Sequence, residues 1–420
     1  MRTIRIRTRA ALLVAGAAML SGCTGGGADA SGGGWDGTVR DSSGVVIVEN
    51  TDNGVWASAD AWTVTEELRI GTTAGDPEYQ FGQISGVAAL ADGRIAVFDQ
   101  QAQELRFFSS DGRYLQKVGG PGSGPGEFAL GAGPVLVAAG DTIVVPDVTN
   151  RRVNRFAPDG TALGSFALDF TSGIPLAWLD REDGGIISQL RPLNFPGQET
   201  VADPNDVLVL RDSDGTIRDT LMVLESGGTI EISDTGAQVT FFSPEPVWAT
   251  SGDGLVFGVN DEYRLNRYDE SGTLTGIVSK PSDTRLVTES DQQLLLDAMV
   301  RLWEDFGITG QALEIARRSI AFADVYPAFA FVRGGPEETI WVQHLQVPSE
   351  LDDEELENFN PQLGFGSPTW DVFDNGGRFL GVVEMPQRFQ PVRFLGDRIY
   401  GIWRDELDVQ YALVLRIEGT

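Results

Sequence analysis

Residues 86–115 read GVAALADGRIAVFDQQAQELRFFSSDGRYL, and this stretch decides the fold. Short runs of alternating apolar residues are separated by polar turns, which predicts four antiparallel strands. Asp92-Gly93 and Asp111-Gly112 mark the first and third turns, because glycine adopts positive φ freely and aspartate tolerates it. The stretch therefore predicts one four-stranded antiparallel sheet.

The same pattern returns about 48 residues later, a spacing typical of one propeller blade. The later copies have their first turns at Gly140-Asp141, Asp183-Gly184, Asp253-Gly254, Glu338-Thr339 and Gly396-Asp397. That makes about six copies, and the last breaks off after its third strand, so residues 62–70 can supply the missing one. The chain is predicted to be all-β, a six-bladed β-propeller closed by strands from both ends, which leaves no long exposed edge. A solenoid is the main alternative.

The run between the first two copies, Val118–Phe128, reads VGGPGSGPGEF and resembles the inter-blade linker of NHL-repeat propellers. The segment Asp92–Asp99 and the strand Arg106–Phe108 before its Asp-Gly turn carry the same resemblance. The match is good over the first two copies and fades through the rest. It implies a six-bladed propeller of NHL-like or lipoprotein type and carries no function, because one fold hosts many functions.

The first 22 residues predict a lipoprotein signal peptide. An arginine-rich start precedes the apolar run Ala10–Leu20, which is shorter than the roughly 20 residues that span a bilayer. The next residues, Leu20-Ser21-Gly22-Cys23, resemble the lipobox of bacterial lipoproteins, and this implies cleavage before Cys23 and lipidation of its thiol. Cys23 is the only cysteine in the chain, so lipidation is a better interpretation than disulfide pairing.

Residues 23–40 are rich in glycine, serine and alanine, so we expect a flexible tether between the lipid and a propeller spanning residues 41–420. The residue after the cysteine is Thr24, not aspartate. By the sorting rule known for some Gram-negative lipoproteins, this favours the outer membrane. The predicted location is therefore the bacterial cell envelope, with the membrane as a partner through the N-terminal lipid.

Composition excludes two classes of function. The formal net charge of -30 argues against nucleic acid as a partner, because binding phosphates needs a basic surface. An anionic lipid surface would also repel this chain, so the lipid must provide the anchor. The only histidine is His344, and enzymes that need a cluster of histidine ligands are therefore excluded.

Three long insertions are predicted to fall on one face of the ring. Residues 192–206 and 347–369 separate second and third strands, and residues 281–326 separate two copies. In a four-stranded meander these positions share a face, and long loops often carry function. We therefore expect this face to be partly capped and to be the working face.

The insertion 281–326 predicts two helices. Thr288 begins the first, which Gly307 ends, and a second helix covers residues 311–320. One apolar stripe recurs at helical spacing, and it either packs on the propeller as core or forms a lid or a docking surface for a partner. The stripe comprises Leu295, Met299, Leu302, Trp303 and Phe306.

Polar residues recur just after the second strand in several copies. We expect some of them to surround the mouth of the central channel and to bind a ligand or a hard cation, which prefers oxygen ligands. The alternative is structural, because aspartate and asparagine in turns often bond their own backbone. No cofactor is predicted, although a divalent cation such as calcium is possible. The candidates, with the lone histidine, are Asp99, Gln101, Asp147, Asn150, Arg152, Asn260, Glu262, His344, Arg404 and Asp405.

Two functions remain open. The first is a non-catalytic module at the envelope that binds a protein, peptide or glycan through the loop-rich face. The alternative is a metal-dependent hydrolase or lyase at the mouth of the channel, with carboxylate and amide ligands. The sequence has no nucleophile elbow, metalloprotease helix or dinucleotide fingerprint, so no catalytic residue is assigned.

Overall fold

The structure is a computed structural model. It describes residues 34–419, except 58, 182, 193–204, 213, 225–229, 234–235, 253, 353–354 and 357–364. The predicted signal peptide, the lipidation site Cys23, most of the tether and most of the insertion 192–206 lie outside the described residues.

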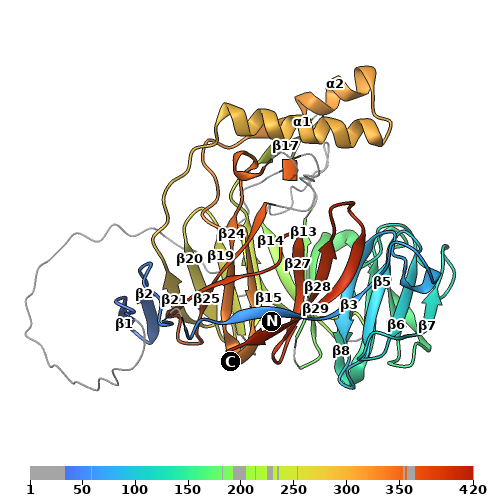
Figure 1. The fold of residues 1–420 in the computed structure, drawn as a ribbon, viewed down its shortest axis with the longest axis horizontal. Helices are drawn as coiled ribbons and strands as arrows, with labels where there is room; N and C mark the ends of the chain where they lie inside the picture. The colour runs from blue at the N-terminus through green and yellow to red at the C-terminus, as the bar shows by residue number, and fades with distance from the viewer. Residues whose placement is uncertain are drawn as a thin grey trace, which may run out of the picture.

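The chain is a six-bladed β-propeller (Figure 1), as the sequence predicts. Each blade has four antiparallel strands, and in the first three blades they follow chain order. Blade one comprises β4 (Ile84–Ala89), β5 (Ile95–Asp99), β6 (Glu104–Phe108) and β7 (Tyr114–Gly119). Blade two comprises β8 (Leu136–Ala138), β9 (Thr142–Asp147), β10 (Arg152–Phe156) and β11 (Ala162–Ala167). Blade three comprises β12 (Ile174–Asp180), β13 (Ile186–Arg191), β14 (Asp206–Arg211) and β15 (Ile217–Leu224).

The strands of blades four and five also follow chain order, and blade six takes its fourth strand from the N-terminal part of the chain. Blade four comprises β18 (Pro246–Ser251), β19 (Gly254–Val259), β20 (Arg264–Tyr268) and β21 (Leu274–Ser279). Blade five comprises β23 (Phe331–Gly334), β24 (Ile340–Leu345), β25 (Gly366–Phe373) and β26 (Phe379–Glu384). Blade six comprises β27 (Phe389–Leu395), β28 (Arg398–Arg404), β29 (Gln410–Glu418) and β3 (Thr63–Ile70). Short 3-10 helices lie in the connections: η1 (Pro77–Tyr79), η2 (Ala139–Asp141), η3 (Phe170–Ser172), η4 (Pro336–Glu338) and η5 (Pro348–Glu350).

The predicted turns of blade one are confirmed. Gly93 has φ of 85°, and the amide of Leu90 donates to the carbonyl of Arg94 at 2.9 Å. The strands bury one face against the next blade: Phe98, Phe107 and Phe128 are all 0% exposed and belong to one core cluster shared by blades one and two. Alternation along the strands thus places a layer of core between these neighbouring blades.

The ring closes with strands from both ends of the chain, as predicted. The strand β3 pairs antiparallel with β29, with Ile70 opposite Ala412 and Thr63 opposite Glu418. Ile70 is 1% exposed and packs in the core between blades one and six. The N-terminal strand therefore covers the edge that blade six would otherwise expose.

An N-terminal hairpin, which the sequence did not predict, extends blade four. It consists of β1 (Thr38–Ser42) and β2 (Val45–Glu49), and β2 pairs in parallel with β21. Trp35 packs against the core of blades four and five, and its Nε1–H donates to Asn50 Oδ1 at 2.9 Å. The folded body therefore begins before residue 41, the boundary predicted for the tether, because Trp35 and β2 find partners contributed by distant segments.

Helices and a small sheet cover one face of the ring, and we call these elements the cap. They are α1 (Glu289–Asp305), α2 (Gly310–Arg318) and the sheet of β16 (Ile230–Ser233), β17 (Gly236–Phe241) and β22 (Ile320–Phe322). Figure 1 shows α1 and α2 above the ends of the blades. The hairpin β16–β17 joins blades three and four, so it is a further insertion on the face that the sequence predicts to be capped. We call this side of the ring the cap face.

The apolar stripe of α1 forms part of a core under the cap. The amide of Asp291 donates to Thr288 Oγ1 at 3.1 Å, which confirms the predicted N-cap. Leu295 and Met299 are buried with Phe242 from the end of β17. Phe306, the last member of the predicted stripe, is 73% exposed, because it is the C-cap residue and lies beyond the helix. None of the helices within the described ranges has the length and apolar character to cross a membrane.

Candidate functional site

A cavity of about 560 Å³ lies between the cap and blades three to six. The cap contributes Phe241 and Phe242 to its lining, and blades five and six contribute Trp370 and Phe389. Strands β23 and β27 are the first strands of their blades, so the cavity lies at the mouth of the central channel on the cap face. The aromatic lining favours an apolar part of a ligand.

Four arginines also line this cavity, although the chain is strongly acidic. They are Arg191, Arg333, Arg388 and Arg404. Arg191 binds the fully buried Asp206 through two hydrogen bonds of 2.9 Å each, and these bonds raise its pKa. Arg404 is 9% exposed, and its Nε lies 3.6 Å from the exposed carboxylate of Asp408.

Arg333 has no carboxylate partner in the part of the chain that the structure describes. Its Nη1 donates to the carbonyl of Val332 at 3.1 Å, its Cζ lies 4.4 Å from the ring centre of Phe331, and its Nε is buried without a hydrogen bond among the described residues. Burial lowers the pKa of Arg333 to about 10, because removal from water disfavours the charged form.

Arg388 lies at the rim with a strained backbone. Its φ of 58° is in the left-handed region, which non-glycine residues adopt at a cost. Its Nη1 donates to the carbonyl of Asp405 at 2.8 Å, and no carboxylate pairs with it within the described ranges. Arg333 and Arg388 therefore both present uncompensated positive charge to the cavity.

Carboxylates in the lining offset part of the positive charge of these arginines. Glu245, Glu355 and Asp408 also line the cavity. Trp370 is 1% exposed, and its Nε1–H has no hydrogen-bond partner among the described residues. The lining therefore combines aromatic surface, several guanidinium groups, three carboxylates and one unsatisfied indole donor.

An ion pair lies in the channel below the cavity. Arg393 Nη1 bonds Asp180 Oδ2, which joins the first strands of blades six and three, opposite each other in the ring. First strands run away from the cap face, and Arg393 follows the cavity residues Gln390 and Pro391 along β27. The pair therefore lies deeper in the channel than the cavity.

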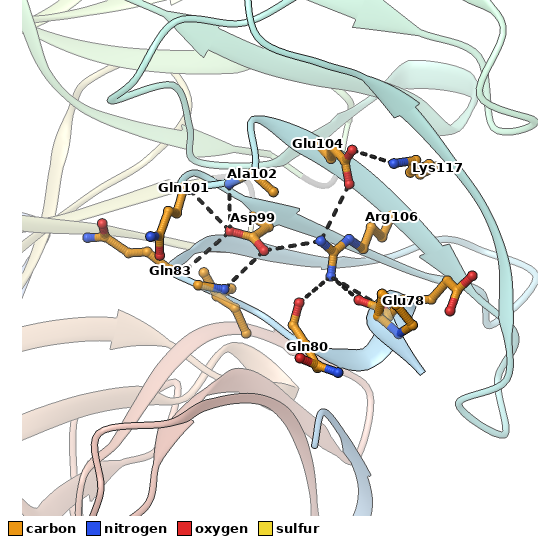
Figure 2. A network of polar contacts seen from close by, with 12 residues as sticks. Glu78, Gln80, Gln83, Asp99, Gln101, Ala102, Glu104, Arg106 and Lys117 are labelled. Carbon is orange, nitrogen blue, oxygen red and sulfur yellow. Dashed lines mark hydrogen bonds and ion pairs between the residues drawn. The ribbon is translucent and has the colours of Figure 1, made fainter. Parts of the chain in front are cut away.

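The sequence-predicted candidates occupy two kinds of position. Asp99 is 1% exposed and accepts hydrogen bonds from the amides of Gly82, Gln83, Gln101 and Ala102. Figure 2 shows the last three of these residues around Asp99. Arg106 Nη2 lies 3.3 Å from its Oδ2. This carboxylate ties the chain before blade one to the turn after β5, and the side chain of Gln101 is exposed.

Asp147 has the equivalent place in blade two. It is 0% exposed and accepts from the amides of Ala129 and Asn150 and from Asn150 Nδ2. Arg152 lies 3.8 Å from Asp147 and donates to the carbonyls of Ser123 and Glu127. These three candidates thus hold the glycine-rich linker between blades one and two.

Of the remaining candidates, Asn260 and Arg404 line the cavity. Asn260 also accepts from the amide of Glu245 and donates to the carbonyl of Phe329. Glu262 is exposed. Asp405 accepts from the amides of Leu407 and Val409.

The lone histidine belongs to a buried charged network between blades four and five. His344 Nε2 lies 2.8 Å from Asp371, which is 0% exposed. Asp371 also accepts from Tyr263 at 2.6 Å and from Lys280 at 3.0 Å. Burial would raise the pKa of Asp371, but the hydrogen bond and charge of His344, with Lys280 and Tyr263, hold it below its usual value.

The sequence reasoning missed Arg191, Arg333 and Arg388. The only feature of the sequence that could have indicated them is Arg333, an arginine in the inner strand of blade five within an otherwise apolar run. Within the ranges described above, no three His, Cys, Asp or Glu side chains come together in a way that could hold a metal ion.

We expect Asp99→Ala to lower the free energy of unfolding by about 3 kcal/mol, because four amides lose their acceptor and Arg106 loses a buried counterion. Asp92→Ala is the matched control, since its partner Arg94 is at the surface, and the expected cost is at most about 1 kcal/mol. Urea denaturation measures both. Equal, small effects would show that the Asp99 network contributes little to stability.

Comparisons with known proteins agree on the fold. Residues 75–182, which span blades one and two and the start of blade three, match a family model described as a 6-bladed beta-propeller. A Bacteroides fragilis protein assigned as exported has a TM-score of 0.51 at 12% identity, over 89% of this chain and 99% of that one. A comparison with curated proteins gave no match.

Two further solved structures are more distant. A catalytically inactive virginiamycin B lyase from Staphylococcus aureus has 11% identity and a TM-score of 0.41 over 85% of this chain and 99% of that one. Regucalcin, a calcium-binding protein from Agrobacterium tumefaciens, has 12% identity and a TM-score of 0.38 over 86% of this chain and 97% of that one. At these identities the likeness is one of fold, and a fold does not carry a function.

Proposed function

We propose that this chain is a non-catalytic ligand-binding propeller held at the bacterial cell envelope, with its binding site in the cavity under the cap. The observation that carries the proposal is the lining of this cavity, which joins aromatic rings to Arg333 and Arg388, two arginines without carboxylate partners among the described residues. A volume of about 560 Å³ lies within the roughly 300–1,000 Å³ of typical small-ligand sites. The cavity can hold a small molecule or one end of a peptide or glycan.

The anchor completes the proposal. The lipobox-like Leu20-Ser21-Gly22-Cys23 supports lipidation of Cys23, and the glycine-rich segment after it supports a tether that lets the propeller reach its ligand near the membrane. Thr24 favours the outer membrane. The partner would be an envelope peptide, glycan or protein that presents a group small enough to enter the cavity.

The test uses a variant that fills the cavity. Ala330 lines it and is only partly exposed, so Ala330→Trp should occupy much of the space. Ala312→Trp is the control, because Ala312 lies on the exposed side of α2. Each soluble body, residues 34–420, is incubated with a cell-envelope extract, and native mass spectrometry detects retained ligands below about 1 kDa.

We expect one bound species on the unsubstituted protein and on Ala312→Trp, and at least about a ten-fold loss of occupancy on Ala330→Trp. Retention of the same species by all three proteins would place binding elsewhere. Retention by none would leave the cavity without a ligand in the extract and would contradict the proposal.

A further inference from the structure

We propose that the ligand of the cavity is an organic carboxylate, whose carboxylate binds Arg333 and whose apolar body packs on the aromatic lining. The inference rests on the proposed function and names the chemistry of its ligand. It follows from the hydrogen-bond and ion-pair partners of the arginines around the cavity, from the aromatic rings beside them and from the carboxylates that also line the cavity.

Arg333 is partly buried and lines the cavity without a carboxylate partner among the described residues. Buried charges are normally paired, because an unpaired charge away from water is costly. Elsewhere in this chain the buried Arg106 has Asp99 and Glu104 within 3.4 Å, and Arg393 has Asp180. Arg333 instead has one backbone carbonyl and one phenyl ring, and its Nε is unsatisfied among the described residues.

A buried arginine without a carboxylate partner does not by itself indicate a ligand site. Arg211 is 6% exposed and has no carboxylate partner among the described residues, but its Nε donates to Ser188 Oγ and its Nη1 to the carbonyl of Gly215. Neutral acceptors thus satisfy its donors. Arg333 differs because it lines the cavity and its Nη2 makes no hydrogen bond among the described residues, so a ligand in the cavity can supply an acceptor.

A carboxylate fits this lining better than a dianion. The planar guanidinium group matches the two oxygens of a carboxylate, and Arg388 and Arg404 add positive charge at the rim. Glu245, Glu355 and Asp408 would repel a second negative charge on the ligand. A phosphate or sulfate dianion is therefore disfavoured relative to a carboxylate monoanion.

The rest of the ligand meets apolar surface. Phe241 and Phe242 line the cavity on the cap side, and Phe389 lines it on the side of blade six. Trp370 adds a further aromatic side chain to the lining. An arylalkanoic acid, such as the probe used below, combines these features.

The experiment measures the affinity of 3-phenylpropanoate and its neutral isostere 3-phenylpropanamide by calorimetry at constant ionic strength. The proteins are the soluble body, Arg333→Met, Ala330→Trp and Ala312→Trp. We expect the acid to bind the unsubstituted protein about ten-fold or more tightly than the amide. Arg333→Met should abolish this preference, Ala330→Trp should lose both probes and Ala312→Trp should lose neither.

The unfolding temperature gives a second test, because replacing an arginine that only stabilises the fold would lower it. Without ligand, Arg333→Met should raise the unfolding temperature by about 2–4 °C, because a partly buried charge without a carboxylate partner among the described residues disappears. Arg106→Met is the matched control and should lower it, because Asp99 loses its counterion. A lower unfolding temperature for Arg333→Met would show that the native fold already compensates its charge.

The outcomes separate this inference from the proposed function. Equal affinity for acid and amide, both lost in Ala330→Trp, would overturn the carboxylate and leave the cavity as a binding site. Unchanged acid affinity in Arg333→Met would also overturn it. If neither probe shows binding that Ala330→Trp abolishes, the carboxylate inference is overturned. Native mass spectrometry with the envelope extract then tests the proposed function separately.

Discussion

A chain that begins at Gly71 is expected to show no cooperative unfolding transition, whereas one that begins at Ala61 keeps it. The first lacks β3, and the second lacks only the segment that carries the β1–β2 hairpin. The strand β3 is the fourth strand of blade six and pairs with seven residues of β29. Its loss exposes the edge of β29 and the core that Ile70 and Trp62 help to cover.

The size of this effect follows from closure of the ring. Without β3 the buried side chains of Leu413, Leu415 and Ile417 lose their cover, and blades one and six lose part of their shared core. The cost is about as large as the whole stability of a typical domain, roughly 5–15 kcal/mol. The chain that begins at Ala61 loses the bonds of Asn50 to Ser279 and Gly377, so its transition should shift to lower temperature.

Calorimetry and near-UV circular dichroism measure both truncations. A cooperative transition for the chain that begins at Gly71, close to that of the longer one, would mean that five complete blades and three strands are stable alone. The strand β3 would then be unnecessary for a stable fold.

Asp371→Ala is expected to cost about 3–5 kcal/mol of unfolding free energy, the usual result of removing one partner of a buried ion pair. Lys280 is 10% exposed, and its other carboxylate neighbour is the exposed Asp52 at 3.6 Å. The variant therefore leaves an ammonium group largely buried, and it leaves Tyr263 and His344 without their shared acceptor.

The double variant Asp371→Ala with Lys280→Met is the control, because it removes both charges. It should recover part of the loss, and the difference in a double-mutant cycle gives the coupling of the pair. A double variant that is less stable than the sum of the single changes would contradict the expected attraction between these groups.

The same carboxylate gives a pH dependence. The folded pKa of Asp371 is lower than its usual value, so its contribution to stability is fully present above the unfolded pKa, about 3.9. The contribution is lost as the pH falls from about 4 through the lower folded pKa. Between pH 5 and pH 2 the stability of Asp371→Ala should therefore fall less steeply than that of the unsubstituted protein, as urea denaturation at each pH will show.

Local chemistry explains why the blades could be predicted from the sequence. Asp92-Gly93 and the equivalent turns are set by residues next to one another, and the alternation of the strands reads out which face is buried. The closing strand was also predictable, because blade six is short of one strand and a suitable strand, residues 63–70, stands near the other end. The turns and strands depend on single segments, and the closing strand follows from the number of strands in each blade.

Pairings between distant segments were not predictable. The strand β2 adds to β21 in parallel, and nothing in residues 45–49 specifies this edge over the edges of the other blades. The cavity has the same origin: Arg191, Arg333 and Arg404 stand far apart in the sequence, and only the ring and the cap bring them together. Arg333 looks like an ordinary strand residue until its missing partner is seen.

The recurring aspartates show a different limit. Sequence reasoning selected Asp99 and Asp147, which are the last residues of the second strands β5 and β9. It left open whether they bind their own backbone or a ligand. Their bonds to amides of neighbouring loops show what they do within the fold, whereas the charge at the cavity comes from arginines that follow no repeat.

The most direct measurement is a crystal structure of the soluble body with 3-phenylpropanoate at a concentration that calorimetry shows to be saturating. We expect density for the acid in the cavity under the cap, with its carboxylate within hydrogen-bond distance of the Arg333 guanidinium group and its ring against Phe241, Phe242 or Phe389. Density for the acid at another site, with the cavity unchanged, would contradict carboxylate binding under the cap.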